Sequence, residues 1–514
     1  MRGPEQSSDG YHSMRRSRLI FHLRVACILP ILASFGCGSG RSGSLASTRV
    51  APTANALVAQ YAVTAFEKNV TAWAEFGTDT TYGRQTSTTP PSTSFNQPLN
   101  ILIAGMKPNT TYHMRAHVEA VDGETWVGPD DTFTTGAIPS SAGTPPGIAV
   151  TRPTPSLEPS SGVEVFNLVA STSTLRCLVT DIDGNIIWYY DPGNGASPTP
   201  MKLMTNGHFI MNVGDLREID LAGNIVRSIT PAAINQSLQA NGYSFTISVF
   251  HHDVIVLPNG HWITLANTSK QFSDLPGYPG VTDVLGDALI DIDLDGNVAW
   301  AWSGFDHLDV NRHLMGLPDW THSNAIIYAP DGNLLLSMRH QSWILKIDYA
   351  DGAGAGDILW RLGYQGDFAL AGGDVSNWFF AQHYPNLETT DGSQMTLTIV
   401  DNGDLRVDAG GNECSTTCYT RATIFEVDEA TGTASLLWQD LPGFYSSWGG
   451  SIGTLPNGDV EFDLTTVAST PASQVMEVTQ TDSPQTVWQL NLTGANAYRG
   501  FRIPSLYPGI SWQK

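Results

Sequence analysis

Basic residues are scarce in this chain. Lys and Arg together number 26 against 49 acidic residues, which gives a net charge of −23 at pH 7. An acidic surface of this kind repels nucleic acid and anionic membranes, so we expect no nucleic-acid partner. The phosphate-binding pattern GxxxxGK[ST] is also absent. A site for an anionic ligand must therefore be built locally.

Long hydrophobic runs are lacking as well. The apolar stretch at residues 25–35 is shorter than the roughly 20 residues that cross a bilayer. It follows the basic segment 14–18 and precedes Gly36 and Cys37, an order typical of secretory leaders. We predict that residues 1–36 form a signal peptide of the lipoprotein type, with lipidation at Cys37 and a tether over 37–49. Ordinary cleavage nearby is the alternative, and either way we expect an exported protein, periplasmic or held at the outer membrane by lipidated Cys37.

Cysteine is rare, with 5 residues in the chain. Beyond the leader only Cys177, Cys414 and Cys418 remain. The short spacing between Cys414 and Cys418 predicts a small-loop disulfide, because an exported protein meets an oxidising compartment. Cys177, in the apolar run TLRCLVT, is predicted to be a buried thiol.

The residues that are abundant indicate an all-β protein. The chain has 50 Gly, 30 Pro and 14 Trp but only 15% charged residues, which favours many turns around a large aromatic core. Residues 50–136 alternate like strands, and the segment 106–115 (MKPNTTYHMR) resembles the corner of fibronectin type III domains, where a Tyr hydroxyl pins a turn. We predict a small β-sandwich there. The Pro- and Ser-rich residues 137–162 indicate a linker or an extended packed strand.

From residue 163 onward, apolar strands that end in Trp recur. All but the first are associated with a hairpin turn such as TNG or PNG, the unit of a β-meander. We predict a six-bladed β-propeller over 163–514, in which the C-terminal segment YRGFRIPSLYPGI lends a strand to the first unit. An incomplete ring of seven or eight blades is the alternative. The residues that mark the six units are Trp188, Arg227 (in place of Trp), Trp300, Trp360, Trp438 and Trp488.

Three histidines stand near the starts of successive units. His252 and His322 precede their turn glycines by even counts, which strand alternation places on one face, whereas His383 has an odd count and needs a bulge or a different loop. Such histidines would face one another across a central channel, and Arg339 could join them. Three imidazoles and a guanidinium suit a tetrahedral oxyanion. His261, His313 and His340 lack this register and are interpreted as structural.

The motifs HHDVIVLPNG, DWTHSNAIIYAPDGNLLLSMRHQS, AQH and IVDNG occur in this order and precede YRGFRIPSLYP. In this order they resemble the bacterial arylsulfate sulfotransferases over roughly residues 160 to 514. That resemblance implies an exported six-bladed propeller that transfers sulfuryl groups between phenols without a nucleotide donor. It implies no cofactor and no metal, with an aryl sulfate donor and a phenolic acceptor as partners; a homodimer is possible.

The resemblance also assigns roles to residues. It implies that His383 is the nucleophile, that His252 and His322 bind sulfate and handle protons, and that Arg339 and Asn324 complete the site. A neutral imidazole can attack sulfur and form a sulfohistidine, which divides the transfer into two steps of a ping-pong mechanism. We add Trp448 and Tyr445 as aromatic substrate contacts. The chain departs from the family in having its CxxxC pair after the nucleophile.

Two other functions fit the same residues. A metal-dependent hydrolase would place Zn²⁺ on His252, His322 and His383, although a dication beside Arg339 would be repelled. A non-catalytic cell-surface propeller would bind a sugar or a protein and keep the histidines as core residues.

Overall fold

The computed structural model describes residues 46–513, apart from residues 194 and 470 and the side chains of 170 and 171. The predicted signal peptide and the lipidation site Cys37 lie outside the described residues. The described part is all-β, and its single α-helix, α1 (Pro231–Ala240), was not foreseen from the sequence. No helix among the described residues is long and apolar enough to cross a membrane. The short 3-10 turns are η1 (Ser140–Ala142), η2 (Gly304–Asp306), η3 (Arg339–Gln341), η4 (Ala350–Gly352) and η5 (Val375–Asn377).

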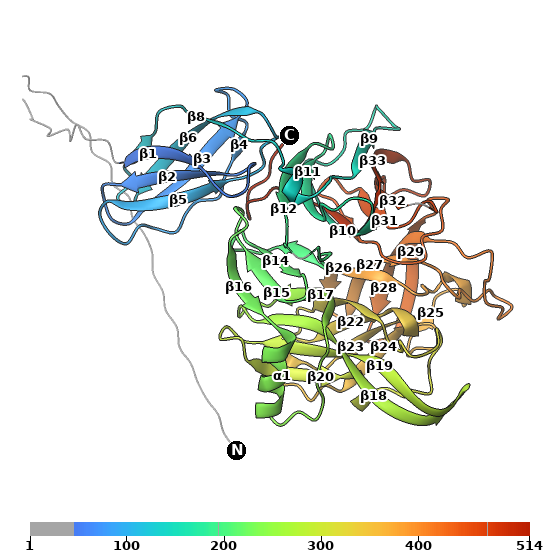
Figure 1. Cartoon of the computed structure of the whole chain (residues 1–514). Coiled ribbons are helices and arrows are strands. Elements are labelled where there is room, and N and C mark those ends of the chain that lie inside the picture. Colours follow the sequence, from blue (N-terminus) through green and yellow to red (C-terminus); the bar gives the residue numbers. More distant parts are fainter. Residues whose placement is uncertain (1–45, 194, 470, 514) are drawn as a thin grey trace, which may run out of the picture. The chain divides into compact units, whose positions relative to one another are not determined.

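Two sheets form the first part of the fold, drawn in blue in Figure 1. One has the order β1-β2-β5, and the other has the order β4-β3-β6-β7 with β8 also paired to β6. Their buried side chains belong to one hydrophobic cluster, since alternate residues of β2 and β3 point inward. The strands are β1 (Ala46–Pro52), β2 (Ala59–Ala65), β3 (Val70–Gly77), β4 (Arg84–Gln85), β5 (Gln97–Ile103), β6 (Thr111–Ala120), β7 (Thr125–Val127) and β8 (Asp131–Thr134).

The Tyr112 hydroxyl in this part accepts a hydrogen bond from the backbone N–H of Lys107 at 2.9 Å. This is the turn-pinning contact expected of the segment 106–115. Strand β1 begins at Ala46, so the ordered sheet starts inside the predicted tether.

Six sheets of four or five strands follow, coloured from cyan to red in Figure 1, and they are antiparallel except for one parallel pair of strands in the fifth sheet. Their orders are β12-β11-β10-β34, β13-β14-β15-β16, β17-β18-β19-β20, β21-β22-β23-β24, β25-β29-β28-β27-β26 and β30-β31-β32-β33-β9. In the first three the strands are β10 (Val163–Ser171), β11 (Cys177–Asp181), β12 (Ile186–Tyr190), β34 (Ala495–Ile503), β13 (Met201–Leu203), β14 (Phe209–Asn212), β15 (Leu216–Ile219), β16 (Ile225–Ile229), β17 (Phe250–Val256), β18 (Trp262–Leu275), β19 (Tyr278–Ile292) and β20 (Val298–Ser303).

In the last three sheets the strands are β21 (Ser323–Tyr328), β22 (Leu334–Met338), β23 (Trp343–Ile347), β24 (Ile358–Gly363), β25 (Ala369–Leu370), β26 (His383–Asp391), β27 (Gln394–Asp401), β28 (Arg421–Asp428), β29 (Thr433–Asp440), β30 (Ile452–Thr454), β31 (Val460–Leu464), β32 (Ala472–Val478), β33 (Thr486–Thr493) and β9 (Gly147–Thr151). The six residues that marked the repeats lie on β12, β16, β20, β24, β29 and β33, one in each sheet. The sequence repeat therefore matches the sheet repeat.

Both ends of this region are fixed by strand pairing. The C-terminal strand β34 pairs with β10, with Ile503 opposite Val163, so the strand borrowed from YRGFRIPSLYPGI is confirmed. Strand β9, within the predicted linker, pairs with β33, which confirms the packed-strand alternative for that segment. The buried Arg502 of β34 forms ion pairs with Glu164, Glu461 and Glu477. These carboxylates come from β10, β31 and β32, so one guanidinium joins the first sheet to the last.

Contacts also join the first two sheets to the later ones. The Tyr507 hydroxyl accepts from the backbone N–H of Ala104 at 2.8 Å, and the indole N–H of Trp512 donates to the carbonyl of Gln85 at 3.0 Å. The amide of Asn55 donates to the carbonyl of Tyr189 at 2.8 Å. Apart from exposed Gln85, these residues are buried, so their polar groups satisfy one another away from water.

Burial raises the pKa of Asp463 to about 7. One of its oxygens accepts from Ser451 and Gly500, and the other has no partner among the described residues. The folded protein thus holds a proton that the unfolded chain releases near pH ~4.

We predict that the free energy of unfolding falls between pH ~4 and ~7, and that Asp463→Asn makes this fall shallower. Denaturant unfolding at several pH values measures this free energy, and Asp482→Asn at an exposed position is the control. If the free energy depends on pH equally steeply in Asp463→Asn and Asp482→Asn, the prediction is wrong.

Candidate active site

The predicted histidines lie at one end of the edge strands that begin their sheets. His252 is the third residue of β17, His322 immediately precedes β21, and His383 is the first residue of β26. The rings of His252 and His322 are 4.7 Å apart between centroids. The Tyr498 ring of β34 lies 5.6 Å from His252 and 5.9 Å from His383. The structure therefore brings all three histidines into one cluster.

Backbone irregularities, and not plain alternation, orient these side chains. The pairing register shifts after His251 in β17, at Asn324 in β21 and after His383 in β26. His252 and His322 themselves adopt left-handed φ angles of 53° and 48°. Alternation along an unbroken strand was thus the wrong reason for placing His252 with His322, whereas the bulge required for His383 is present. Non-glycine residues in this region of φ concentrate at functional sites.

Asn402 fixes the protonation of the His383 ring. The amide nitrogen of Asn402 donates to the carbonyls of Ser446 and Gly449, at 2.8 and 3.0 Å, so its oxygen must face the ring. That oxygen lies 2.7 Å from Nδ1 of His383, which therefore carries the proton and donates it. The backbone N–H of Gly449 donates to Nε2 at 3.2 Å, so this nitrogen carries a lone pair and no proton. His383 is consequently a neutral imidazole with its lone pair on Nε2.

Gly449 is required at that position. Its φ is +71°, and a Cβ there would lie 2.1 Å from the hydroxyl oxygen of Thr465. The segment Ser447–Gly449 was noted in the sequence only for Trp448, so this backbone contact had no sequence signal. Asn402 was visible only as part of IVDNG, where Asn before Gly indicates a turn.

Arg339 is anchored beside His383. Its Nη1 donates to Nε2 of His340 at 2.7 Å, and its Nη2 donates to the carbonyl of Ser447 at 3.0 Å and faces Asp404 at 3.4 Å. Its Nε–H is buried and has no partner among the described residues. His340, interpreted from the sequence as structural, thus orients the guanidinium. The unpaired Nε–H is a donor available to an anion.

A second chain of contacts stands behind His252. Asp287 faces Nε2 of His251 at 3.1 Å, and Nδ1 of His251 lies 2.7 Å from Nδ1 of His252. Simple strand alternation would point His251 away from His252, but the bulge in β17 brings both rings together. One Nδ1 of this pair must donate to the other, so the tautomer of His252 is coupled to that of His251.

His322 is paired directly with a carboxylate. Its Nδ1 lies 2.5 Å from Oδ2 of Asp319, and its ring stacks on His340 with 4.6 Å between centroids. Among the described residues, Asp319, His322 and His340 have ligand atoms close enough to hold a metal ion. His252 and His383, which the zinc alternative required, do not belong to this group. Nε2 of His340 is occupied by Arg339, whose charge opposes a dication.

The remaining predicted residues surround the cluster. Asn324 is buried, and its amide donates to the carbonyl of Gln382 at 2.7 Å, so it holds the residue before His383. Trp448 is half-buried next to Gly449. Tyr445 is 45% exposed, and its hydroxyl donates to Asp404. Cys414 and Cys418 form a disulfide, and Cys177 is a buried free thiol.

Two residues of β34 join the site without having been singled out from the sequence. The buried Tyr498 hydroxyl has no hydrogen-bond partner among the described residues. Buried Arg499 donates to Asp253 at 3.2 Å and to the carbonyl of Asn324 at 2.5 Å. Their signal was the motif YRGFRIP, which the sequence analysis used only for ring closure.

Burial determines the charge of the cluster. Desolvation lowers the pKa of both His252 and His383 well below the usual value, and neighbouring positive groups add to this effect. For His383 the largest of these neighbours is Arg339. Desolvation and His322 lower the pKa of His340 to about 4. The site thus combines neutral imidazoles with fixed guanidinium charges.

The site combines neutral histidines with arginines within an all-β repeat, a set of groups whose chemistry suits an anion. The chain belongs to the arylsulfotransferase (ASST) family, whose model matches residues 155–501. The family resemblance seen in the sequence is confirmed over this range, and it identifies the chain as a sulfotransferase enzyme. No curated protein sequence matches the chain.

The chain aligns with several solved structures at low similarity. A catalytically inactive virginiamycin B lyase from Staphylococcus aureus with quinupristin is 13% identical, with a TM-score of 0.35 over 68% of this chain and 99% of that chain. A streptogramin B lyase is 11% identical, with a TM-score of 0.30 over 67% and 98%. A protein from Lactobacillus plantarum is 10% identical, with a TM-score of 0.35 over 67% and 99%. No residue role or ligand is inferred from these likenesses.

We predict that Asn402→Asp raises the pKa of His383, because a carboxylate opposite Nδ1 stabilises the imidazolium. In the unaltered protein His383 should still be neutral at the ordinary histidine pKa of ~6.5, because desolvation and the neighbouring Arg339 lower its pKa well below that value. NMR of ¹³C-labelled histidine, with the signal assigned through His383→Gln, measures both values. Asn412→Asp in an exposed turn is the control. A His383 ring that titrates at its ordinary pKa contradicts the assignment.

Proposed function

We propose that the protein transfers a sulfuryl group from an aryl sulfate to a phenolic acceptor through a sulfohistidine at His383. The observation that carries this proposal is the neutral Nε2 of His383 held beside a guanidinium that has an unpaired N–H. A nucleophile must keep its lone pair, and a sulfate group needs fixed positive donors. Both requirements are met by residues that reach the site from separate sheets.

The proposed fold is a six-bladed β-propeller, with each of the six sheets as one blade and the pairing of β34 with β10 closing the ring. The repeat of Trp-containing strands and the Arg502 ion pairs between first and last sheets support it. We propose that the first two sheets are a fibronectin type III-like sandwich, supported by the Tyr112 contact. In this arrangement the histidine cluster lines one end of the central channel.

In the first half-reaction, Nε2 of His383 attacks sulfur in line with the departing aryl oxygen. An N–S bond forms, the S–O bond breaks, and the phenolate leaves with the electron pair. Arg339 stabilises the equatorial oxygens, whose charge must be held in a loose transition state. Nδ1 of His383 keeps its proton, and Asn402 accepts its hydrogen bond throughout.

The leaving oxygen needs a proton, and His322 is the proposed donor. Asp319 accepts from Nδ1 of His322, which leaves Nε2 as the nitrogen that exchanges a proton with the substrate oxygen. In the second half-reaction Nε2 of His322 takes the proton of the acceptor phenol. The phenol oxygen then attacks sulfur, the O–S bond forms, and the N–S bond breaks to restore His383. Neutral His252 lies against His322 and serves to bind the sulfuryl oxygens.

Asn324, Trp448 and Tyr445 complete the proposed site. Asn324 supports the strand of His383 through Gln382. Trp448 and Tyr445 flank the Ser447 carbonyl that anchors Arg339, so their rings are suitably placed to contact an aryl group. A metal-independent transfer needs no further group.

We predict that His383→Ala lowers nitrophenolate release from 4-nitrophenyl sulfate by about three orders of magnitude or more, because the covalent path is lost. Wild type incubated without acceptor should gain the mass of one sulfuryl group on His383, and added phenol should remove it. Absorbance and intact-protein mass spectrometry measure the two effects. The control is His261→Ala, since His261 is bonded to Asp291 outside the cluster. Undiminished release in His383→Ala, with sensitivity to chelators, would favour the metal hydrolase instead.

We predict that Arg339→Lys lowers kcat about 10²–10³-fold, because an ammonium cannot keep the Ser447 and His340 contacts while presenting a further N–H to sulfate. Steady-state kinetics with 4-nitrophenyl sulfate measures it. Arg361→Lys is the matched control, since Arg361 pairs with Asp367 near the surface. Equal rates in Arg339→Lys and wild type would exclude Arg339 from the site.

A further inference from the structure

An open pocket of about 630 Å³ adjoins the cluster on the side of Arg339. Asp404 lines the pocket and lies 3.4 Å from Nη2 of Arg339. Tyr445 also lines it, and its hydroxyl donates to Asp404. A molecule in this pocket would therefore touch residues that contact the guanidinium directly.

One wall of the pocket is a braced loop between β27 and β28. Arg406 in this loop donates to Asp401 at 2.8 Å and to the carbonyl of Trp378 at 3.1 Å, and Arg421 donates to the same carboxylate at 2.6 Å. The disulfide of Cys414 closes the end of the loop, and both of its cysteines line the pocket. Such a wall is formed before a ligand arrives, which reduces the entropy cost of binding.

The pocket is lined by apolar residues and by two acidic residues, and no basic residue lines it. Leu314, Met315, Leu405 and the Tyr445 ring offer apolar surface, and Leu405 is held at a left-handed φ of 58°. Asp404 and Glu413 are the charged lining residues, and no Lys or Arg lines the pocket. Asp404 is matched by Arg339, whereas Glu413 has no ion-pair partner among the described residues. The pocket therefore presents a flat apolar surface next to one uncompensated negative charge.

We propose that this pocket binds the ring of the phenolic acceptor and selects acceptors that carry a cationic amine over those that carry a carboxylate. The proposal rests on the sulfuryl transfer proposed above and adds a preference among acceptors. The amine would lie near Glu413 while the phenol oxygen points past Asp404 toward Arg339 and His383. Because Glu413 is exposed to solvent, its effect is that of a screened surface pair, roughly two- to five-fold in kcat/KM for each acceptor.

The test compares three acceptors with a common phenol group: tyramine, neutral 4-ethylphenol and 3-(4-hydroxyphenyl)propionate. With 4-nitrophenyl sulfate as donor, the expected order of kcat/KM is tyramine, then 4-ethylphenol, then the propionate. Glu413→Gln should bring the three values together, and Glu413→Lys should reverse the order. The preference should also shrink as salt is added.

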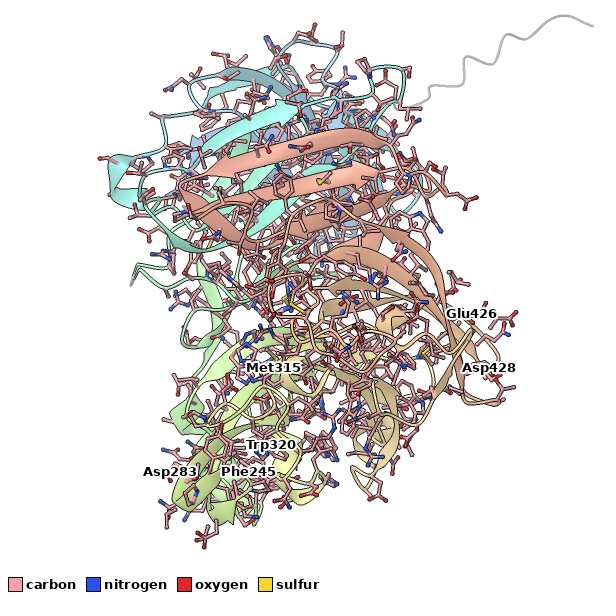
Figure 2. All side chains as sticks on the ribbon, turned by 90° about the vertical axis from the view of Figure 1, so that its right-hand side faces the viewer. Phe245, Asp283, Met315, Trp320, Glu426 and Asp428 are labelled. Atoms are coloured by element: carbon pink, nitrogen blue, oxygen red, sulfur yellow. A yellow bond between two sulfur atoms is a disulfide. The ribbon has the colours of Figure 1, made fainter. Side chains whose placement is uncertain are left out.

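Glu426→Gln and Glu426→Lys are the matched controls, since they make the same charge changes on β28. Figure 2 shows Glu426 well apart from Met315 of the pocket. These controls should keep the wild-type order, because the field of the distant, partly buried Glu426 is screened before it reaches the pocket. A loss of the order in the Glu426 variants as well would make it an effect of net charge and overturn the proposal.

The outcomes separate the two proposals. Transfer to all three phenols with an order that Glu413→Gln and Glu413→Lys leave unchanged would overturn the pocket proposal and leave the sulfotransferase function intact. If no phenol is sulfated and no sulfuryl group appears on wild-type protein, the proposed function itself fails. Each ratio compares acceptors on one protein, so partial loss of folded variant cancels from it.

Discussion

The site depends on one buried carboxylate, that of Asp253 in β17. Its Oδ1 accepts from Lys202 of β13 at 2.5 Å and from Arg499 of β34 at 3.2 Å, and its Oδ2 accepts from the backbone N–H of Ile326 in β21 at 2.9 Å. Strands of four sheets thus meet at a single side chain. Loss of one partner from such a buried network costs roughly 3–5 kcal/mol, because the others keep uncompensated charge. His252 directly precedes Asp253, and His322 lies four residues before Ile326, so the positions of both histidines depend on this junction.

The same constraint explains how the site keeps its histidines neutral. Asp253 offsets one positive charge although it binds both Lys202 and Arg499, so the interior next to the imidazoles stays positive. Arg499 accordingly contributes to the lowered pKa of both His252 and His383. Fixed guanidinium groups would bind sulfate, while the imidazoles they keep unprotonated would do the chemistry. One charge pattern therefore serves two requirements that would conflict if histidine had to be both cation and nucleophile.

The sequence predicted the strand repeat well because each sheet repeats the same local pattern of turn and apolar strand. It could also place His252, His322 and His383 together, because their motifs stand at equal positions in successive repeats. It could not predict Asn402, Gly449 or the role of His340. Asn402 and Gly449 act on His383 from other segments, through contacts that exist only once neighbouring sheets have packed. The bulges could not be predicted either, because a histidine with a left-handed φ, such as His252, does not mark a bulge in the sequence as a glycine would.

The overall charge of −23 sets a further condition on any anionic donor. The surface field opposes its approach, so capture must depend on the short-range donors of Arg339 and on the removal of water. Burial strengthens both, because a guanidinium in a dry cleft interacts with sulfate far more strongly than it does in water. An uncharged phenol meets no such opposition, and the approach of a cationic phenol is favoured by Glu413 and the acidic surface. In the proposed mechanism the molecule thus separates its tasks in space, with attraction for a cationic acceptor at the pocket mouth and attraction for the sulfate at Arg339.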